Sequence, residues 1–323
     1  MRIVVIGATG HIGTFLVPRL VRAGHEVVTI TRGTRTAYAD APEWQQVERV
    51  TADRDQEDRD GTFGSRIAAL GADAVVDLVC FTESSAAALV DALRGTGTHL
   101  VHCGSIWRAG VSHVLPITEQ DATPPFGDYG VQKDAIARML KEETASGGLV
   151  TTSLHPGHIS GPGWMPIGPL GNLDPAVITR LARGEVVEVP GLGAESMAHV
   201  HADDVAQLFQ RAVEQREAAA GQDFFATAPT ALTVRGYAHL VASWAGREAR
   251  LESVSWDRFR GTTAPEHADA SWEHLSRSQV FSTEKPQRVL GYEPAFTASE
   301  TVRDALRWQV EHGGIDVPET FRP

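Results

Sequence analysis

The chain has 323 residues, of which 42% are hydrophobic and 22% charged, and its formal net charge is −12. This composition is typical of a globular protein with one large or two ordinary domains. The acidic balance, without any basic run, excludes the electrostatic footprint of nucleic-acid binding, so we expect no nucleic-acid partner. The cysteines, Cys80 and Cys103, lie in apolar runs, which predicts free thiols and a reducing cytoplasm. Neither a signal peptide nor a membrane span is expected, because the apolar runs are too short.

The first half alternates strand-like and helix-like runs, beginning with the almost wholly apolar "RIVVIG". This alternation predicts an α/β fold, a Rossmann-type doubly wound parallel sheet. The mixed-charge run at 53–60 is predicted to be a solvated loop. The expected strands lie at 2–7, 26–31, 73–80, 99–104 and 149–157, and the expected helices lie at 11–24 and 83–95 and from about 129 onwards.

The second half has a less regular pattern, in which Gly- and Pro-rich loops precede helical patterns near 174–183, 200–214 and 299–313. We expect a smaller, discontinuous C-terminal substrate lobe there. The predicted NAD(P)-binding Rossmann domain covers 1–160 and is completed by 198–228, and the substrate-binding lobe comprises 161–197 and 229–323.

A glycine turn, "GATGHIG" at 7–13, joins the first predicted strand to the first helix. Glycines at this place allow a tight turn and a close approach of a pyrophosphate to the helix N-terminus. The second strand ends in "TITRGTR", without the acidic residue that would bind the ribose hydroxyls of NAD. Because Arg32 and Arg35 can pair with a 2′-phosphate, we predict NADP in preference to NAD.

A candidate catalytic set follows the fifth strand. Ser105 ends that strand, Tyr129 comes 24 positions later, and Lys133 lies one helical turn beyond the tyrosine. A tyrosine with a pKa near 10 is a poor base at neutral pH, and a neighbouring ammonium favours its phenolate. The alternative interpretation is one exposed turn of helix, but the glycine turn upstream favours catalysis.

These motifs together resemble the short-chain dehydrogenase/reductase superfamily. "GATGHIG", "YGVQK", "HPGHISGPG" and "VHADDVA", in this order, resemble its extended branch, the NAD-dependent epimerase/dehydratase family, and "LGYEP" at 290–294 fits as well. The resemblance implies that Ser105 binds the substrate oxygen, Tyr129 carries the proton and Lys133 binds the nicotinamide ribose. It also implies a homodimer packed through the helix that bears Tyr129 and the helix that precedes it. The expected cofactor-binding residues are Gly7, Thr9, Gly10, His11, Ile12, Gly13, Arg32, Asp53, Arg54, Leu78, Val79, Cys80, Lys133, Pro156, Gly157 and His158.

The chain departs from the family pattern at several positions. "SIWRAG" replaces an aromatic-glycine pair and places Trp107 and Arg108 in the expected pocket, and the family arginine that begins "RP" is His155 here. The arginine that grips a diphosphate in nucleotide-sugar epimerases corresponds to Met197, whereas "GNL" at 171–173 matches their substrate loop. The expected substrate residues are Thr82, Trp107, Arg108 and Asn172, with Trp164 and Met165 as further apolar walls.

We therefore predict an oxidoreductase that interconverts an alcohol and a ketone. A nucleotide-sugar epimerase or dehydratase is the first alternative, and a non-catalytic cofactor- or RNA-binding relative is the second. The histidine pairs in "HPGH" and "HVH" are spaced like metal ligands, but no third group completes a tetrahedral set, so no metal is predicted.

Overall fold

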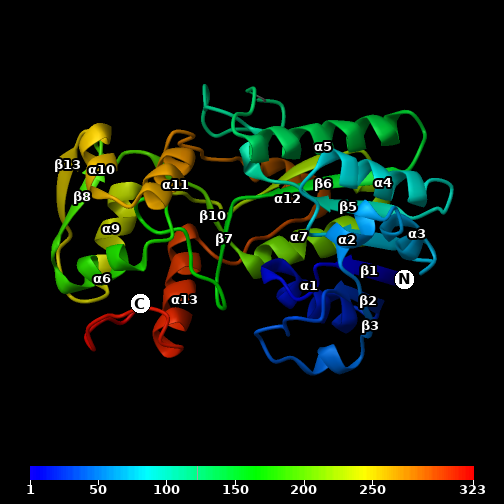
Figure 1. The fold of residues 1–323 in the computed structure, drawn as a ribbon, viewed down its shortest axis with the longest axis horizontal. Helices are drawn as coiled ribbons and strands as arrows, with labels where there is room; N and C mark the ends of the chain where they lie inside the picture. Colours follow the sequence, from blue (N-terminus) through cyan, green and yellow to red (C-terminus); the bar gives the residue numbers. More distant parts are fainter. Residues whose placement is uncertain (122) are drawn as a thin grey trace.

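The structure is a computed structural model that describes residues 1–121 and 123–323, and Figure 1 shows two bodies side by side. The larger body is built on a seven-stranded sheet in the order β11-β6-β5-β4-β1-β2-β3. All of its neighbouring strands are parallel, as in a doubly wound Rossmann fold. Its strands are β1 (Arg2–Ile6), β2 (Glu26–Thr31), β3 (Glu48–Thr51), β4 (Ala74–Asp77), β5 (His99–Cys103), β6 (Val150–Pro156) and β11 (Asp223–Ala226).

Helices cover both faces of this sheet because successive strand residues point to opposite sides. Ile3 and Val5 of β1 pack in one core with α1 and α7, whereas Val4 and Ile6 pack in another with α3, α4 and α5. Burial on both faces explains why the strand is apolar throughout. The helices of this body are α1 (His11–Arg22), η1 (Pro42–Gln45), α2 (Arg54–Arg59), α3 (Phe63–Ala68), α4 (Glu83–Leu93), η2 (Ile106–Arg108), α5 (Asp128–Ala145), α7 (Ala202–Glu214) and α8 (Arg216–Ala219).

The mixed-charge run at 53–60 forms the short helix α2, so the predicted loop is wrong. The Asp53 side chain caps the helix by accepting a hydrogen bond of 3.1 Å from the backbone N–H of Gln56. Arg54 is buried and points inward, where its Nη1 lies 2.6 Å from Asp77. The run therefore has one exposed side and one buried ion pair.

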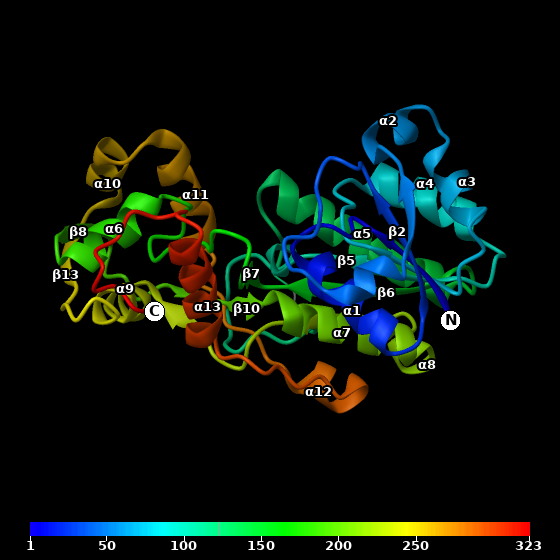
Figure 2. The ribbon, with the colours of Figure 1, turned by 90° about the horizontal axis from the view of Figure 1, so that it is seen from below.

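The smaller body has its own apolar core, built mainly from helices and the parallel pair β8 and β13. Short strand pairs, β7 with β10 and β9 with β12, lie between its helices and the large sheet. Figure 2 shows α13 on the side that faces the larger body. The remaining elements are β7 (His158–Ser160), α6 (Pro175–Arg183), β8 (Val186–Pro190), β9 (Ser196–Met197), β10 (His199–His201), β12 (Leu232–Thr233), α9 (Val234–Ser243), β13 (Arg250–Val254), α10 (Trp256–Thr262), α11 (Pro265–Leu275), α12 (Glu284–Leu290) and α13 (Ala298–Glu311).

One late segment returns to the larger body instead of staying with the smaller one. Leu290 and Tyr292 are buried in the core that contains α1 and α7, and the Tyr292 hydroxyl donates to the carbonyl of Thr227. The Lys285 ammonium donates to the carbonyl oxygen of Asp223 at 2.6 Å. Residues 284–292 thus belong spatially to the Rossmann body, although the sequence pattern had placed them in the substrate lobe. In residues 1–121 and 123–323, none of the helices has the length and hydrophobicity that crossing a bilayer demands.

Candidate active site

The glycine turn between β1 and α1 leaves no room for side chains at two positions. Gly7 has a φ of +82°, and a Cβ there would lie 2.6 Å from Cγ1 of Val79. A Cβ on Gly13 would lie 2.2 Å from the carbonyl oxygen of Ala8. The helix begins at His11 without a side-chain cap. Its first N–H groups and the positive end of its dipole are free to bind a pyrophosphate, so this turn fits a dinucleotide.

A cavity of about 370 Å³ opens beside the turn, at the ends of β1 and β2. Arg32 and Arg35 line it and are exposed. Asp53 lines the same cavity. Arg54 does too, but its guanidinium bonds both carboxylate oxygens of Asp77, at 2.6 and 2.7 Å. An anion at this rim would therefore meet Arg32 and Arg35 first.

A second cavity, of about 480 Å³, continues from the first, and both are lined by Gly7, Gly10, Val79, Phe81 and Trp164. The shared residues make the two cavities one continuous groove. Cys80 lines neither cavity, but its carbonyl oxygen binds Lys133. The expected cofactor residues that line one or both cavities are Gly7, Thr9, Gly10, His11, Ile12, Gly13, Arg32, Asp53, Arg54, Leu78, Val79, Lys133, Pro156, Gly157 and His158.

Ser105, Tyr129 and Lys133 all line the second cavity. Ser105 caps η2, where its hydroxyl oxygen accepts a hydrogen bond of 3.2 Å from the backbone N–H of Trp107. Tyr129 is the second residue of α5, and Lys133 follows one turn later. The ammonium donates at 2.7 Å to the carbonyl oxygens of Cys80 and Cys103. It also lies 5.7 Å from the centre of the Tyr129 ring. Two strand ends and one helix thus bring the three side chains together.

The charged forms of both titratable groups are disfavoured in this cavity. Burial of its phenol raises the pKa of Tyr129 to about 12, with a smaller contribution from the Cys103 thiol and an opposing hydrogen bond to Ser105. Although 42% of the Tyr129 residue remains exposed, its phenol lies beside Ser105 inside the cavity. Burial also lowers the pKa of Lys133, against the effect of Cys103 and Cys80. The phenol is therefore protonated at neutral pH, as a proton donor must be.

Aromatic rings and histidines form a wall of the second cavity. The Trp107 ring lies 4.9 Å from the His274 ring, which in turn lies 4.9 Å from His158. Trp164 stacks on His11 with ring centres 5.2 Å apart. Burial holds the pKa of His158 and His274 below the ordinary value, so both imidazoles are neutral. The wall is suited to planar or ring-shaped groups that form neutral hydrogen bonds.

Arg277, just after α11, contacts the segment between Trp107 and Phe126. Its guanidinium lies 3.9 Å from the centre of the Trp107 ring and 3.8 Å from the centre of the Phe126 ring. It donates to the Phe126 carbonyl at 2.8 Å and to a Glu273 carboxylate oxygen at 2.9 Å. The sequence analysis missed His274 and Arg277, because they lie more than 140 residues after Tyr129 in the irregular half. Arg277 lies two residues beyond Leu275, the last residue of α11, so helical spacing does not connect it with His274.

Three expected substrate residues lie elsewhere. Arg108 is not among the residues that line the cavity, because its guanidinium bonds Asp134 beneath α5. The buried Asn172 side chain donates to the Ser271 hydroxyl at 2.9 Å and lines a different cavity in the smaller body. Thr82 is exposed and caps α4. These side chains are needed for local structure, which their positions in the sequence did not reveal. Trp107 does line the cavity, as expected.

Among residues 1–121 and 123–323, one group of side chains has the spacing of metal ligands: Asp77, Cys80 and His102, all buried. The Arg54 guanidinium bonds both oxygens of Asp77, so that carboxylate is already paired with a cation. Burial raises the pKa of the Cys80 thiol to about 12, which disfavours the thiolate that binds metals. The group is therefore explained by its ion pair. The histidines of "HPGH" and "HVH" do not belong to it.

The parallel sheet and its strand order define a Rossmann-type α/β protein. The model of the NAD-dependent epimerase/dehydratase family matches residues 3–226, and the chain therefore belongs to this family of NAD-dependent enzymes. Among solved structures, UDP-glucose 4-epimerase from Thermotoga maritima in complex with UDP-glucose has a TM-score of 0.71 and 19% identity. The match covers 97% of this chain and 99% of that one, and at this identity it shows the fold alone.

Two relatives have different activities. A 2′-dehydrokanamycin reductase from Streptomyces kanamyceticus is 32% identical over 147 residues, which are 46% of this chain and 40% of that protein. The matched segment thus spans less than half of that relative. A chloroplast stem-loop binding protein of 41 kDa from Arabidopsis thaliana is 28% identical over 329 residues, which cover 97% of this chain and 80% of that protein. The family therefore does not fix one reaction for this chain.

Proposed function

We propose that this protein is an NAD(P)-dependent oxidoreductase that interconverts an alcohol and a ketone. The observation that carries the proposal is the convergence of Ser105, Tyr129 and Lys133 on the cavity that continues from the glycine turn. A Ser, a Tyr and a Lys in one cavity beside a dinucleotide groove are the groups that carbonyl reduction requires: an oxygen ligand, a proton donor and a cation.

The residues divide the chemistry among them. When bound, the nicotinamide supplies the hydride in reduction or accepts it in oxidation. Ser105 binds the reacting oxygen, and Tyr129 gives that oxygen its proton in reduction or removes the proton in oxidation. Two of the three N–H donors of Lys133 bind carbonyl oxygens, so one remains for the ribose or the phenolate. This ammonium favours the phenolate whenever Tyr129 has lost its proton.

We assign the cofactor to residues 1–160 and 198–228, and the substrate lobe to 161–197 and 229–323 with the exception of 284–292. NADP is the proposed preferred cofactor, because Arg32 and Arg35 are exposed at the rim of the first cavity and the strand before them ends without an acid. Guanidinium groups bind phosphate through paired hydrogen bonds. The Discussion gives the titration that tests this preference.

The proposed substrate is a ketone or alcohol without a nucleotide diphosphate. Met197 has an uncharged side chain, which is fully buried in the core of the smaller body, so this position offers no cation to a diphosphate. The nearby Arg277 is held by Trp107, Phe126 and Glu273. A diphosphate needs cationic partners, whereas Trp107 and its neighbouring rings provide surfaces for stacking. The proposal fails if UDP-glucose, UDP-galactose or dTDP-glucose is epimerised or dehydrated at an ordinary turnover rate, in which case the enzyme is a nucleotide-sugar epimerase or dehydratase.

We further propose a homodimer packed through α4 and α5. The apolar residues Ile136 and Leu140 of α5 are buried against the sheet, so they are not available for a contact between subunits. The outward side of α5 instead carries Val131, which is 46% exposed, next to Ala135 and Arg138. Light scattering at micromolar concentration tests the proposal, and a monomer would contradict it.

The central experiment compares Tyr129→Phe with Tyr237→Phe, which removes the hydroxyl of a buried tyrosine in the smaller body. Among the described residues that hydroxyl has no hydrogen-bond partner, so its loss should change little. Oxidation of NADPH is followed with a panel of cyclic ketones and keto sugars. Tyr129→Phe should bind cofactor normally while turnover falls roughly a hundred-fold or more. Equal turnover in Tyr129→Phe and the unmodified protein would reject the assignment. Tight cofactor binding without turnover of any compound would favour the non-catalytic alternative.

A further inference from the structure

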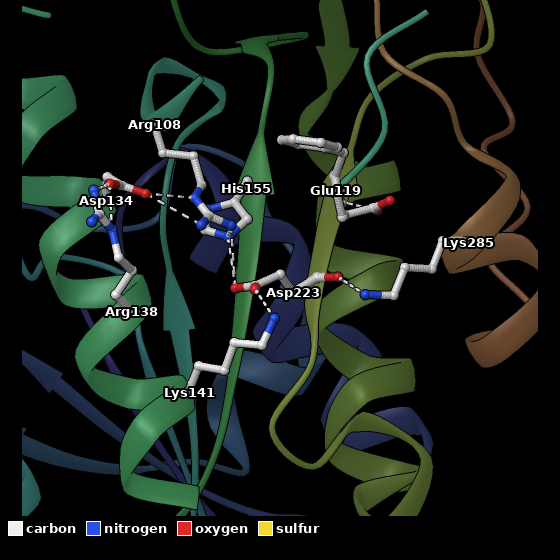
Figure 3. A network of polar contacts seen from close by, with 9 residues as sticks. Arg108, Glu119, Asp134, Arg138, Lys141, His155, Asp223 and Lys285 are labelled. Atoms are coloured by element: carbon white, nitrogen blue, oxygen red, sulfur yellow. Dashed lines mark hydrogen bonds and ion pairs between the residues drawn. The ribbon is translucent and has the colours of Figure 1, made fainter. Parts of the chain in front are cut away.

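A buried polar cluster lies beneath α5, outside the residues that line the cavity, and four elements contribute to it (Figure 3). Arg108 ends η2, Asp134 lies on α5, His155 on β6 and Asp223 on β11. The Arg108 guanidinium donates to Oδ1 of Asp134 from Nε at 3.3 Å and from Nη2 at 3.2 Å. Its Nη1 lies 3.4 Å from Oδ1 of Asp223. Nε2 of His155 lies 3.3 Å from each of these two atoms.

The cluster is enclosed and its charges are matched. The side chains of Arg108, Asp134 and Asp223 are 12%, 6% and 5% exposed. Burial alone would raise the pKa of Asp223, but its contacts with His155, Arg108 and the Lys141 ammonium hold that pKa well below the ordinary value. Removal of Arg108 would take one cation from each buried carboxylate and leave Arg138 with Asp134 and Lys141 with Asp223, and breaking such buried pairs costs far more than breaking a surface pair. The cluster therefore holds its four elements firmly in place.

Two departures from the family pattern meet in this cluster. His155 stands where the resemblance places an arginine, and Arg108 stands in the segment where it places an aromatic-glycine pair. In the structure the Arg108 guanidinium lies against the His155 ring. Burial, and then the charge of Arg108, lower the pKa of His155 to about 4, so the imidazole is neutral. The guanidinium of this centre thus comes from the catalytic segment instead of from β6.

Arg108 and Asp134 are each close in sequence to a residue of the candidate active site. Ser105 caps the three-residue helix η2 that Arg108 ends, and Asp134 directly follows Lys133. The segment and the helix also touch, since a Cβ on Gly130 would lie 2.6 Å from the carbonyl oxygen of Trp107. The ion pair therefore joins the element that carries the hydroxyl to the helix that carries the phenol and the ammonium.

We propose that Arg108 is a positioning residue for the active site. Through Asp134 and Asp223 it holds Ser105 within reach of the Tyr129 phenol, a role that a substrate-contacting arginine would not have. The proposal rests on the proposed function, because it assigns Arg108 to the same three catalytic groups. A guanidinium suits the task, since its planar fork reaches two carboxylates and an imidazole at once, which a lysine ammonium cannot do with the same geometry.

The test measures ionisation of Tyr129 and needs no substrate. An ultraviolet difference titration between the protein and its Tyr129→Phe variant, both saturated with NADP⁺, reports the pKa of that phenol. The same subtraction is made in an Arg108→Lys and an Arg108→Met background. Arg108→Lys keeps the charge and loses the fork, so the Ser105 hydrogen bond should weaken and the Tyr129 pKa should rise by about one unit, or roughly ten-fold less phenolate at a given pH.

Two further variants separate positioning from general stability. Arg94→Met removes another arginine–carboxylate pair of α5, the one with Glu143, far along the helix from Tyr129. It should leave the Tyr129 pKa unchanged even if the melting temperature falls. Adding His155→Arg to Arg108→Met returns a guanidinium to the same centre from β6. The double variant restores the charge of the centre but not its link to η2, so it should recover less than half of the shift.

Several outcomes would overturn the inference. Arg108→Lys with a Tyr129 pKa within about 0.3 unit of the unmodified protein would show that position is not involved. Equal shifts in Arg94→Met and Arg108→Met would show a loss of stability only, and recovery of more than half of the shift in the double variant would show that the charge of the centre acts without its link to η2. If Arg108→Met does not fold, Arg108→Lys against Arg94→Met decides. If Tyr129→Phe turns over substrate as fast as the unmodified protein, the proposed function fails first, and the inference fails with it.

Discussion

Arg277 should contribute more to stability than its position on an irregular stretch suggests. The residue is 1% exposed, and its guanidinium is enclosed between the rings of Trp107 and Phe126 at 3.9 and 3.8 Å. Burial lowers its pKa, against the opposing effect of Glu273, yet an arginine stays protonated at neutral pH. The perturbation we propose is Arg277→Lys, which keeps the charge in the same place and removes the planar group.

The contacts set the expected magnitude. A desolvated cation on an aromatic face contributes about 2 kcal/mol, and a lysine cannot lie flat between two rings, so one face is lost. The hydrogen bond from Nη2 to the Phe126 carbonyl contributes about 1 kcal/mol more and leaves a carbonyl without a partner. The ammonium of the Arg277→Lys variant remains buried, so the free-energy cost of desolvating the charge stays. We expect the free energy of unfolding to fall by about 3 kcal/mol.

Urea unfolding followed by tryptophan fluorescence measures this difference. Arg258→Lys is the matched control, because Arg258 is 55% exposed and pairs with Glu188 at the surface. It should change the free energy of unfolding by less than about 0.5 kcal/mol. If Arg277→Lys also lies within about 1 kcal/mol of the unmodified protein, the two ring contacts do not stabilise the junction and the reasoning is refuted.

Two further predictions concern the cofactor and acid stability. Calorimetric titration should show NADPH bound more tightly than NADH, and Arg32→Ala should weaken NADPH roughly ten- to a hundred-fold while sparing NADH; equal affinities in the unmodified protein would refute the preference. The hydrogen bond from Arg94 lowers the pKa of Glu143 from 4.5 to about 2, so its stabilisation is complete above pH 4.5 and disappears as the pH falls through 2. The unfolding free energy of Glu143→Gln should therefore fall less steeply over this interval, and parallel curves for the two proteins would contradict the linkage.

The Rossmann half was predictable because its signals are local. A strand buried on both faces, such as Arg2–Ile6, is apolar at nearly every position, and the glycine turn follows it directly. The charged run at 53–60 shows the limit of such reasoning. A composition rich in Asp and Arg is typical of solvated loops, yet Asp53 caps a helix and Arg54 finds a buried carboxylate 23 residues away. The pairing partner, not the composition, decides whether a charge is buried.

The candidate site was only partly predictable for the same reason. Ser105, Tyr129 and Lys133 lie within 30 positions, at spacings that reflect one strand end and one helical turn. His274 and Arg277 reach the same wall from the other half of the chain, and a single sequence without coupled positions does not show this juxtaposition. Asn172 was expected to bind substrate because "GNL" at 171–173 resembles a substrate loop of nucleotide-sugar epimerases, and in the structure its amide bonds Ser271 within the smaller body.

Arg108 shows how two deviations from the family pattern can conceal one physical requirement. Considered separately, an arginine shortly after Ser105 indicates a substrate contact, and a histidine in place of an arginine on β6 indicates a lost charge. In three dimensions they lie 3.3 Å apart, and one guanidinium serves the buried centre from the opposite side. A buried carboxylate such as Asp223 needs a cation nearby, but the physics does not specify which strand supplies it. In this chain the cation near Asp223 comes from Arg108, in the segment that also holds Ser105. The pairing of the buried carboxylates at the sheet edge is therefore coupled to the geometry of the active site.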